Sequence, residues 1–291
     1  MVSKFFGWTS SKNLMDIILK YYDFNNDVNF NSKYCFTCNS DFTHAILFNK
    51  VTPKLNIPKE NVIGLAQEPA IFLNIDNDKK FQKYCKIYVN KYFIGKLNSL
   101  KEPFVEKMSF QLPGMALSDS VENNIKNKNI NYILSNKIQK EKEKELLYNY
   151  RHLLLNKICN NKLDIDIYGK CVTTLNHKNK NIKYSLSQKD VVSIYKDYKF
   201  SIVIENTQEP EYFTEKIIIP LLCGCIPIYL GCHNINNYFD KYIVNLTGNL
   251  DKDFNIISNI LKNPEDYYKK IDTEEIKKII NIKNIIYNFF L

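Results

Sequence analysis

Short apolar segments alternate with helical patterns along most of the chain. Segments rich in Ile, Val, Phe and Tyr have the length and composition of buried strands. We expect strands at residues 4–7, 34–37, 45–48, 61–66 and 86–89, and a second series at 131–134, 163–168, 199–204 and 226–230. Helical patterns lie between them, at 11–22, 139–159, 188–195 and 214–223. This alternation predicts an α/β fold, in which parallel sheets carry helices on both faces.

A polar stretch rich in Asn and Lys, residues 118–129, separates the two series of strands. Such a stretch is typical of a linker between domains. We therefore expect one α/β domain over residues 1–130 and a second over residues 131–270, with a cleft between them. Only helical patterns follow the second series, and residues 271–291 are expected to form a C-terminal helix.

Composition narrows the class of protein. The chain has 291 residues, of which 45% are hydrophobic and 24% charged, as in a packed globular protein. It shows no apolar run long enough to cross a membrane and no signal-peptide core at its start, so we expect a soluble, cytoplasmic protein without a membrane span, or one in a host cytoplasm if the source is a virus. The net charge is +9, but lysines alternate with acids, as at residues 140–145. This is typical of a solvated helix face and disfavours nucleic acid as a partner.

Cysteines and glycines exclude several chemistries. The eight cysteines are expected to be reduced thiols, because no export signal is evident. Cys35 and Cys38 form a lone CxxC without a second pair, which disfavours a structural zinc site. The eight glycines are scattered, so neither a dinucleotide-binding nor a P-loop motif is present. We expect any bound phosphate to be held by side chains and helix N-termini.

The most informative window begins where the strand at 199–204 ends in Glu205 and Asn206. Thr214 is a suitable N-cap for the helix that follows, and Gly224 a suitable end for it. Lys216 lies in the first turn, where the helix dipole disfavours a cation. This indicates an anionic ligand, although an ordinary helix start with a surface lysine would give the same local pattern.

The window also resembles the donor-binding signature of glycosyltransferase family 10, the α-1,3/1,4-fucosyltransferases. Three segments match it in order and spacing, namely Glu205-Asn206-Thr207, Tyr212-Phe213-Thr214-Glu215-Lys216 and Pro227-Ile228-Tyr229-Leu230-Gly231. Residues 164–169, Ser135-Asn136 and Gln67-Glu68-Pro69 resemble further segments of the family. Thr207 replaces a serine, and Pro220 lies inside the helix, where we expect a kink. The resemblance implies two Rossmann-like domains facing a cleft, the GT-B type, with the acceptor on residues 1–130 and the nucleotide-sugar donor on residues 131–270.

The resemblance also implies the site. Glu68 would be the catalytic base, while Arg151 and Lys216 would neutralise the donor diphosphate. Asn206, Tyr212 and Glu215 would hold sugar and ribose hydroxyls, and Ser135 and Gly169 would complete the donor site. Glu68, Ser135, Gly169 and Asn206 each follow a predicted strand, where ligands bind in parallel α/β sheets. Arg151 is the single arginine against 39 lysines, which suggests a need for bidentate geometry.

The expected reaction is an inverting transfer of fucose from GDP-fucose to a hydroxyl of an acceptor glycan, with no obligatory metal and no other cofactor. Two alternatives stay open. A metal-dependent transferase would hold its ion on a DxD pair, for which Asp76 with Asp78 and Asp164 with Asp166 have the spacing. The second alternative is a basic, non-enzymatic protein that binds nucleic acid.

Overall fold

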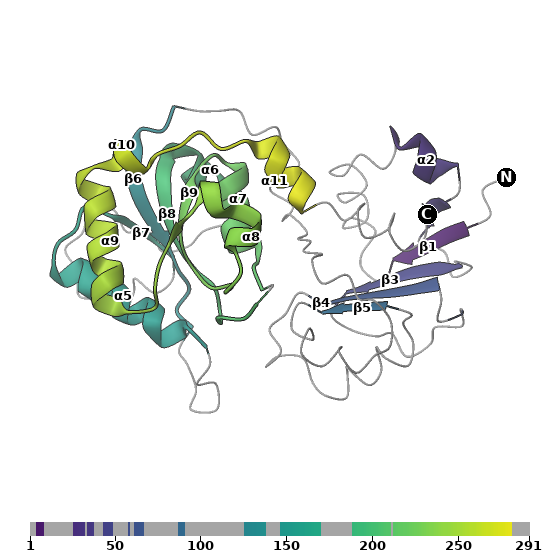
Figure 1. Cartoon of the computed structure of the whole chain (residues 1–291), viewed down its shortest axis with the longest axis horizontal. Coiled ribbons are helices and arrows are strands. Elements are labelled where there is room, and N and C mark those ends of the chain that lie inside the picture. Colours follow the sequence, from purple (N-terminus) through teal and green to yellow (C-terminus); the bar gives the residue numbers. More distant parts are fainter. Residues whose placement is uncertain are drawn as a thin grey trace. The chain divides into compact units, whose positions relative to one another are not determined.

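The computed structural model divides the chain into two compact units. Unit 1 comprises Met1–Ser118 and Ile280–Leu291, and unit 2 comprises Asp119–Ile279. The boundary therefore falls at the start of the polar stretch 118–129. The structure describes residues 4–8, 26–32, 34–37, 43–48, 58, 61–66, 87–90, 125–137, 146–169, 188–210 and 212–280. Figure 1 shows the elements of both units.

Unit 1 contains a parallel sheet in the order β2-β1-β3-β4-β5. Its strands are β1 (Lys4–Trp8), β2 (Tyr34–Thr37), β3 (His44–Phe48), β4 (Val62–Ala66) and β5 (Ile87–Asn90), and a short helix, α2 (Val28–Asn31), precedes β2. All pairings among these strands are parallel, for example Phe6 with Phe36 and Ile46 with Ile63. Each strand overlaps a predicted one.

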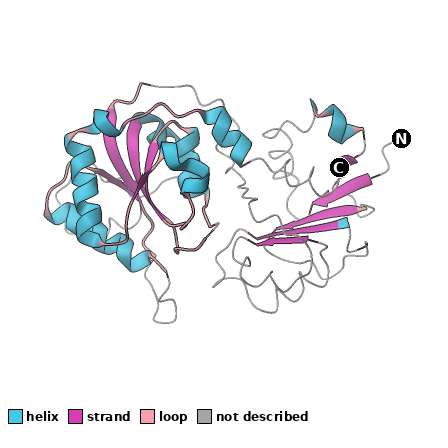
Figure 2. Cartoon of the chain, viewed as in Figure 1, coloured by secondary structure: helices cyan, strands magenta, loops and turns pink. Residues whose placement is uncertain are grey.

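Unit 2 contains a second parallel sheet, in the order β10-β9-β8-β6-β7 (Figure 2). Its strands are β6 (Lys128–Ile133), β7 (Asp166–Tyr168), β8 (Tyr198–Ile204), β9 (Ile226–Leu230) and β10 (Val244–Asn245). β9 is buried at every position and β8 at every position except Lys199, which is why these two segments are mostly apolar. β10 was not predicted, because two residues are too few to give a pattern.

Helices cover both faces of this sheet. They are α5 (Tyr148–Asn160), α6 (Gln188–Asp197), α7 (Glu215–Leu222), α8 (Asn236–Phe239), α9 (Leu250–Lys262), α10 (Pro264–Tyr267) and α11 (Thr273–Ile279), with a 3-10 turn at Asp240–Tyr242. Figure 1 shows α5 and α9 on one face, and α6 and α7 on the other. α7 is buried from Ile217 to Leu222, as its apolar sequence dictates. The predicted α/β fold class is confirmed.

The strand order has a consequence for ligand binding. Both sheets follow the doubly wound order 2-1-3-4-5, numbered from the first strand of each unit. In unit 2 the chain runs from β6 outward to β7 and then crosses back to β8. Crevices outside the carboxyl ends of strands form where the order reverses, here between β6 and β8. The segments that follow these two strands are therefore the first place to look for a site.

Candidate functional site

Several of the predicted residues lie at this switch point in unit 2. β8 leads directly into Glu205 and Asn206, and β6 leads into Leu134 and Ser135. The chain just before α5 pairs with the segment after β8, because the N–H of Leu147 donates to the carbonyl of Asn206 over 2.7 Å. The start of α5 is thereby fixed beside the end of β8.

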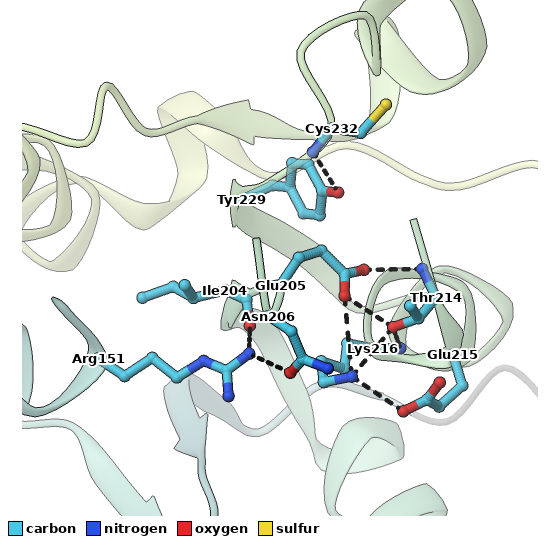
Figure 3. Close-up of polar contacts among 9 residues, drawn as sticks. All are labelled: Arg151, Ile204, Glu205, Asn206, Thr214, Glu215, Lys216, Tyr229 and Cys232. Carbon is cyan, nitrogen blue, oxygen red and sulfur yellow. Dashed lines mark hydrogen bonds and ion pairs between the residues drawn. The ribbon is translucent and has the colours of Figure 1, made fainter. Parts of the chain in front are cut away.

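Arg151 extends from α5 toward the end of β8. Its Nη2 donates to the carbonyl oxygen of Ile204 over 2.6 Å and to Oδ1 of Asn206 over 3.0 Å. The guanidinium also lies 5.1 Å from the centre of the Tyr148 ring, within range of a cation–π interaction. The side chain is 94% buried, since Arg151 is only 6% exposed. Figure 3 shows the guanidinium directed at the Asn206 carboxamide.

The remaining donors of Arg151 are not used within the described part of the chain. The hydrogen bonds of its guanidinium group to described residues all come from Nη2, so Nε and Nη1 have no partner there. The N-cap of the neighbouring helix α5, Leu147, supplies no side-chain cap. A buried cation with spare donors beside such a helix N-terminus is suited to an anion such as a phosphate.

The start of α7 carries a second group of charges. Thr214 is the N-cap, as predicted, and its hydroxyl accepts from the backbone N–H of Lys216. The Lys216 Nζ lies 3.2 Å from Thr214 Oγ1, 3.1 Å from Glu215 Oε1 and 3.8 Å from Glu205 Oε2. The anion that faces Lys216 in this structure is thus a pair of carboxylates of the protein itself (Figure 3).

These contacts shift the ionisation of all three groups. Burial raises the pKa of Glu205, and this outweighs the opposing effects of Lys216 and of the hydrogen bonds from Thr214. Burial lowers the pKa of Lys216, but the Glu205 and Glu215 carboxylates outweigh it, so the pKa lies above the ordinary value. Burial also raises the pKa of Glu215, yet Lys216 outweighs it and the net direction is downward. Lys216 therefore stays charged at neutral pH.

The structure brings four predicted site residues together, namely Arg151, Asn206, Glu215 and Lys216. They are linked by the Arg151–Asn206 and Lys216–Glu215 contacts, and the Arg151 charge acts on the pKa of Lys216. Their side chains come from α5, from the end of β8 and from α7. The spacing of the sequence alone does not give these contacts, because Arg151 and Asn206 are 55 residues apart.

The other predicted residues lie at different places. Ser135 is exposed just beyond β6, and Gly169 lies at the end of β7. A Cβ at Gly169 would lie 2.0 Å from the Leu134 carbonyl oxygen, so this glycine permits the close approach of two strand ends. Tyr212 is almost fully buried, with 1% exposed. Glu68, two residues beyond β4, lies outside the described residues.

The contacts of Glu205 and Gly231 were not predicted from the sequence. Glu205 is 0% exposed, and both its oxygens accept hydrogen bonds from Thr214. It cannot reach an acceptor hydroxyl in this structure. Gly231 is explained by the same side chain, because a Cβ there would lie 2.5 Å from Glu205 Cγ. The signal in the sequence that could have indicated this contact was the fixed spacing of Glu205 and Gly231 within the signature.

The described residues give no support to a metal site. They contain no group of three or more His, Cys, Asp or Glu side chains placed to hold an ion. Asp164 and Asp166 lie before and at the start of β7, at the sheet edge opposite the site, and Asp166 accepts a hydrogen bond from Tyr198. Asp76, Asp78 and Cys38 lie outside the described residues. Among the described helices, none is long and apolar enough to cross a membrane.

Comparison with known proteins agrees with the geometry. Residues 123–246 match the model of the C-terminal domain of glycosyltransferase family 10, the fucosyltransferases. Alpha-(1,3)-fucosyltransferase B of Drosophila melanogaster is 37% identical over 84 residues, which cover 26% of this chain and 18% of that protein. GDP-fucose protein O-fucosyltransferase 3 of Danio rerio is 27% identical over 130 residues, which cover 41% of this chain and 27% of that protein. The matches thus span about a fifth to a quarter of these relatives.

A solved structure extends the likeness to the fold of nearly the whole chain. The crystal structure of an α1,3-fucosyltransferase superposes with a TM-score of 0.50 at 15% identity, covering 98% of this chain and 88% of that one. At this identity the likeness shows the fold. This chain and that fucosyltransferase therefore share an α/β fold. The resemblance to glycosyltransferase family 10 that was read from the sequence is confirmed over residues 123–246, which lie within unit 2.

Proposed function

We propose that the protein is a fucosyltransferase that binds GDP-fucose in unit 2 and transfers fucose to an acceptor hydroxyl. The observation that carries this proposal is Arg151, a buried cation with spare donors at the switch point of the sheet. The family match and the name of the Drosophila relative support fucose as the sugar. GDP as the nucleotide is supported by the name of the Danio rerio relative.

The proposed roles follow from the contacts. Arg151 and Lys216 neutralise the diphosphate that leaves when the bond from the anomeric carbon to its phosphate oxygen breaks. Asn206 and Glu215 offer oxygens and an amide to the sugar and ribose hydroxyls, and Ser135 and Gly169 bound the site at the ends of β6 and β7. Tyr212, which is buried, supports the loop before α7. None of these steps requires a metal ion.

Glu68 is the proposed base. It removes the proton from the acceptor hydroxyl as the new bond to the anomeric carbon forms on the face opposite the leaving diphosphate, which inverts the configuration. Its position two residues after β4 supports this role, because residues after parallel strands lie at the ligand-binding edge. The acceptor would bind to unit 1.

The acceptor has two candidate classes. The Drosophila relative is named for an α-(1,3) linkage, which favours a glycan hydroxyl. The Danio rerio relative is named as a protein O-fucosyltransferase, which favours a side-chain hydroxyl of a protein. We propose the glycan, because the Drosophila relative is 37% identical over its matched residues and the Danio rerio relative 27%.

A nucleotide panel tests the donor. We expect GDP and GDP-fucose to raise the melting temperature of the full chain in the presence of EDTA, since a ligand that binds only the folded state stabilises it. UDP, CDP and ADP sugars serve as the controls at equal concentration. Stabilisation by a uridine nucleotide alone, and only with a divalent ion, would favour the metal-dependent transferase instead.

A further inference from the structure

A carboxylate that no substrate can reach lies beneath the proposed donor site. Glu205 directly follows β8 and is 0% exposed. Its Oε1 accepts from the backbone N–H of Thr214 over 2.8 Å, and its Oε2 accepts from the Thr214 hydroxyl over 2.8 Å. Both oxygens are therefore held by the residue that begins α7.

The position of this carboxylate is fixed from the other side as well. The N–H of Glu205 donates to the carbonyl of Leu230 at the end of β9, over 2.8 Å. Gly231 packs so closely that a Cβ would lie 2.5 Å from Glu205 Cγ, 2.5 Å from the Tyr229 hydroxyl and 2.7 Å from Glu205 Cβ. Real Cβ atoms do not approach so closely, so a larger residue at position 231 requires the side chain of Glu205, of Tyr229 or of both to move.

The hydrogen-bond pattern indicates that Glu205 is ionised, although burial raises its pKa. The Thr214 hydroxyl accepts from both the backbone N–H and Nζ of Lys216. Its single proton is therefore directed at Glu205, whose Oε2 acts as the acceptor. A buried carboxylate is costly without a nearby cation, and the Lys216 Nζ lies 3.8 Å away.

Glu205 and Glu215 are unequal partners of Lys216. The Glu215 side chain is 50% exposed and lies on the outer side of the helix start, where it is free to turn toward water or a substrate hydroxyl. The Glu205 side chain is enclosed and held at both oxygens. Figure 3 shows both carboxylates beside the Lys216 ammonium. Of these two, the enclosed Glu205 is the one suited to hold the ammonium in a constant position when a ligand binds.

We infer that Glu205 is a positioning residue, the fixed counter-charge that holds the Lys216 ammonium and the first turn of α7 in place for the donor diphosphate. The inference rests on the proposed function for its ligand, but the coupling between Glu205 and Lys216 exists without it. Glu205 does not touch the substrate. It acts through Thr214 and Lys216.

The test begins with Glu205→Gln, which keeps the size of the side chain and removes its charge. Competitive labelling with a trace acylating reagent, followed peptide by peptide over pH, measures the pKa of Lys216 in the ligand-free protein. We expect this pKa to fall toward the ordinary value of 10.5, because the ammonium loses one of its two carboxylates. GDP affinity, measured by calorimetry, should fall roughly 10- to 100-fold. As the pH is raised, the variant should lose its remaining GDP affinity at a lower pH than the wild type does, because its Lys216 loses the proton earlier.

Asp253→Asn is the matched control. Asp253 is also 0% exposed, and its Oδ1 accepts from the N–H and the hydroxyl of Thr247, both over 2.7 Å. It forms no ion pair with a described lysine or arginine. Its Oδ2 accepts from the Tyr150 hydroxyl on α5, so the Lys216 pKa is the readout of this control. The variant should lower the melting temperature while the Lys216 pKa stays at the wild-type value, which separates positioning from a general loss of stability.

Gly231→Ala gives a second route if Glu205→Gln does not fold. It keeps every charge and crowds the Glu205 side chain together with the Tyr229 hydroxyl, so the Lys216 pKa should fall in the same direction. An unchanged Lys216 pKa in Glu205→Gln, or in Gly231→Ala where Glu205→Gln does not fold, would overturn the inference, whether or not GDP binds. A wild type that fails to bind GDP would contradict the proposed function alone. A wild type that binds GDP and a Glu205→Gln variant of equal affinity would contradict the positioning role.

Discussion

Arg151 shows what one planar side chain supplies that a lysine cannot. Its Nη2 holds the Ile204 carbonyl and the Asn206 carboxamide together, and this leaves Nε and Nη1 for a ligand as far as the described residues are concerned. A lysine has one nitrogen, which would have to serve both purposes. In a chain with 39 lysines, this geometry gives a physical reason for the single arginine.

Arg151→Lys should therefore be nearly as damaging as Arg151→Ala. We expect Arg151→Ala to lower kcat/KM for the donor by roughly 10²–10³-fold, as for the loss of a group that stabilises developing charge. Steady-state kinetics with GDP-fucose measure both variants. Lys157→Ala is the matched control, because Lys157 lies on the same helix but pairs with the exposed Asp251. Kinetics close to wild type in Arg151→Lys would refute the role given to the guanidinium fork.

At the scale of elements, the end of β7 depends on a glycine. Gly169 has a φ of +111°, a conformation that side chains rarely adopt, and a Cβ there would lie 2.0 Å from the Leu134 carbonyl oxygen. The N–H of Leu134 donates to the carbonyl of Tyr168 over 3.0 Å, so the ends of β6 and β7 meet at this point. The approach shapes the edge on which the donor is expected to bind.

Gly169→Ala should destabilise the fold by more than backbone strain alone. Gly248→Ala is the matched control, because its φ of +79° is also left-handed while the nearest atom to its Cβ would be 3.6 Å away. Strain of about 1–3 kcal/mol is common to both variants, and the clash adds to it only at Gly169. Urea unfolding measures the difference. Equal losses in the two variants would show that the close approach to Leu134 relaxes without cost.

Local signals determined which elements could be predicted. Thr214 and Gly224 were predicted as the two ends of a helix because capping depends on residue types that are close together in the sequence. The structure confirms Thr214 as the N-cap of α7 and gives Gly224, just after its end, a φ of +69°. The predicted strand 163–168 begins only at Asp166, because the N–H groups of Leu163 and Ile165 bond within the preceding turn. The contact between Glu205 and Thr214 depends on how the loop between them folds back. The pattern of apolar and polar residues does not indicate how that loop folds.

At the scale of the molecule, the sequence predicted two α/β units but not their strand order. The alternation of strands and helices predicts parallel sheets. The strand order depends on where each crossover connection places the next strand in the sheet, which the alternation does not indicate. Both units adopt the order 2-1-3-4-5, which places a switch point between β6 and β8 and another between β1 and β3. The cleft between the units and the position of Glu68 stay predictions.

The transfer reaction tests the central proposal most directly. The full chain is incubated with GDP-fucose and EDTA, with a glycan and a hydroxyl-bearing protein as separate acceptors, and the products are analysed by mass spectrometry. The account predicts a fucosylated glycan and free GDP from the wild type, and a loss of about 10²–10⁴-fold in rate for Glu68→Gln with GDP affinity retained. Fucose on the protein alone would reassign the acceptor. No fucose on either acceptor, although GDP binds, would contradict the account.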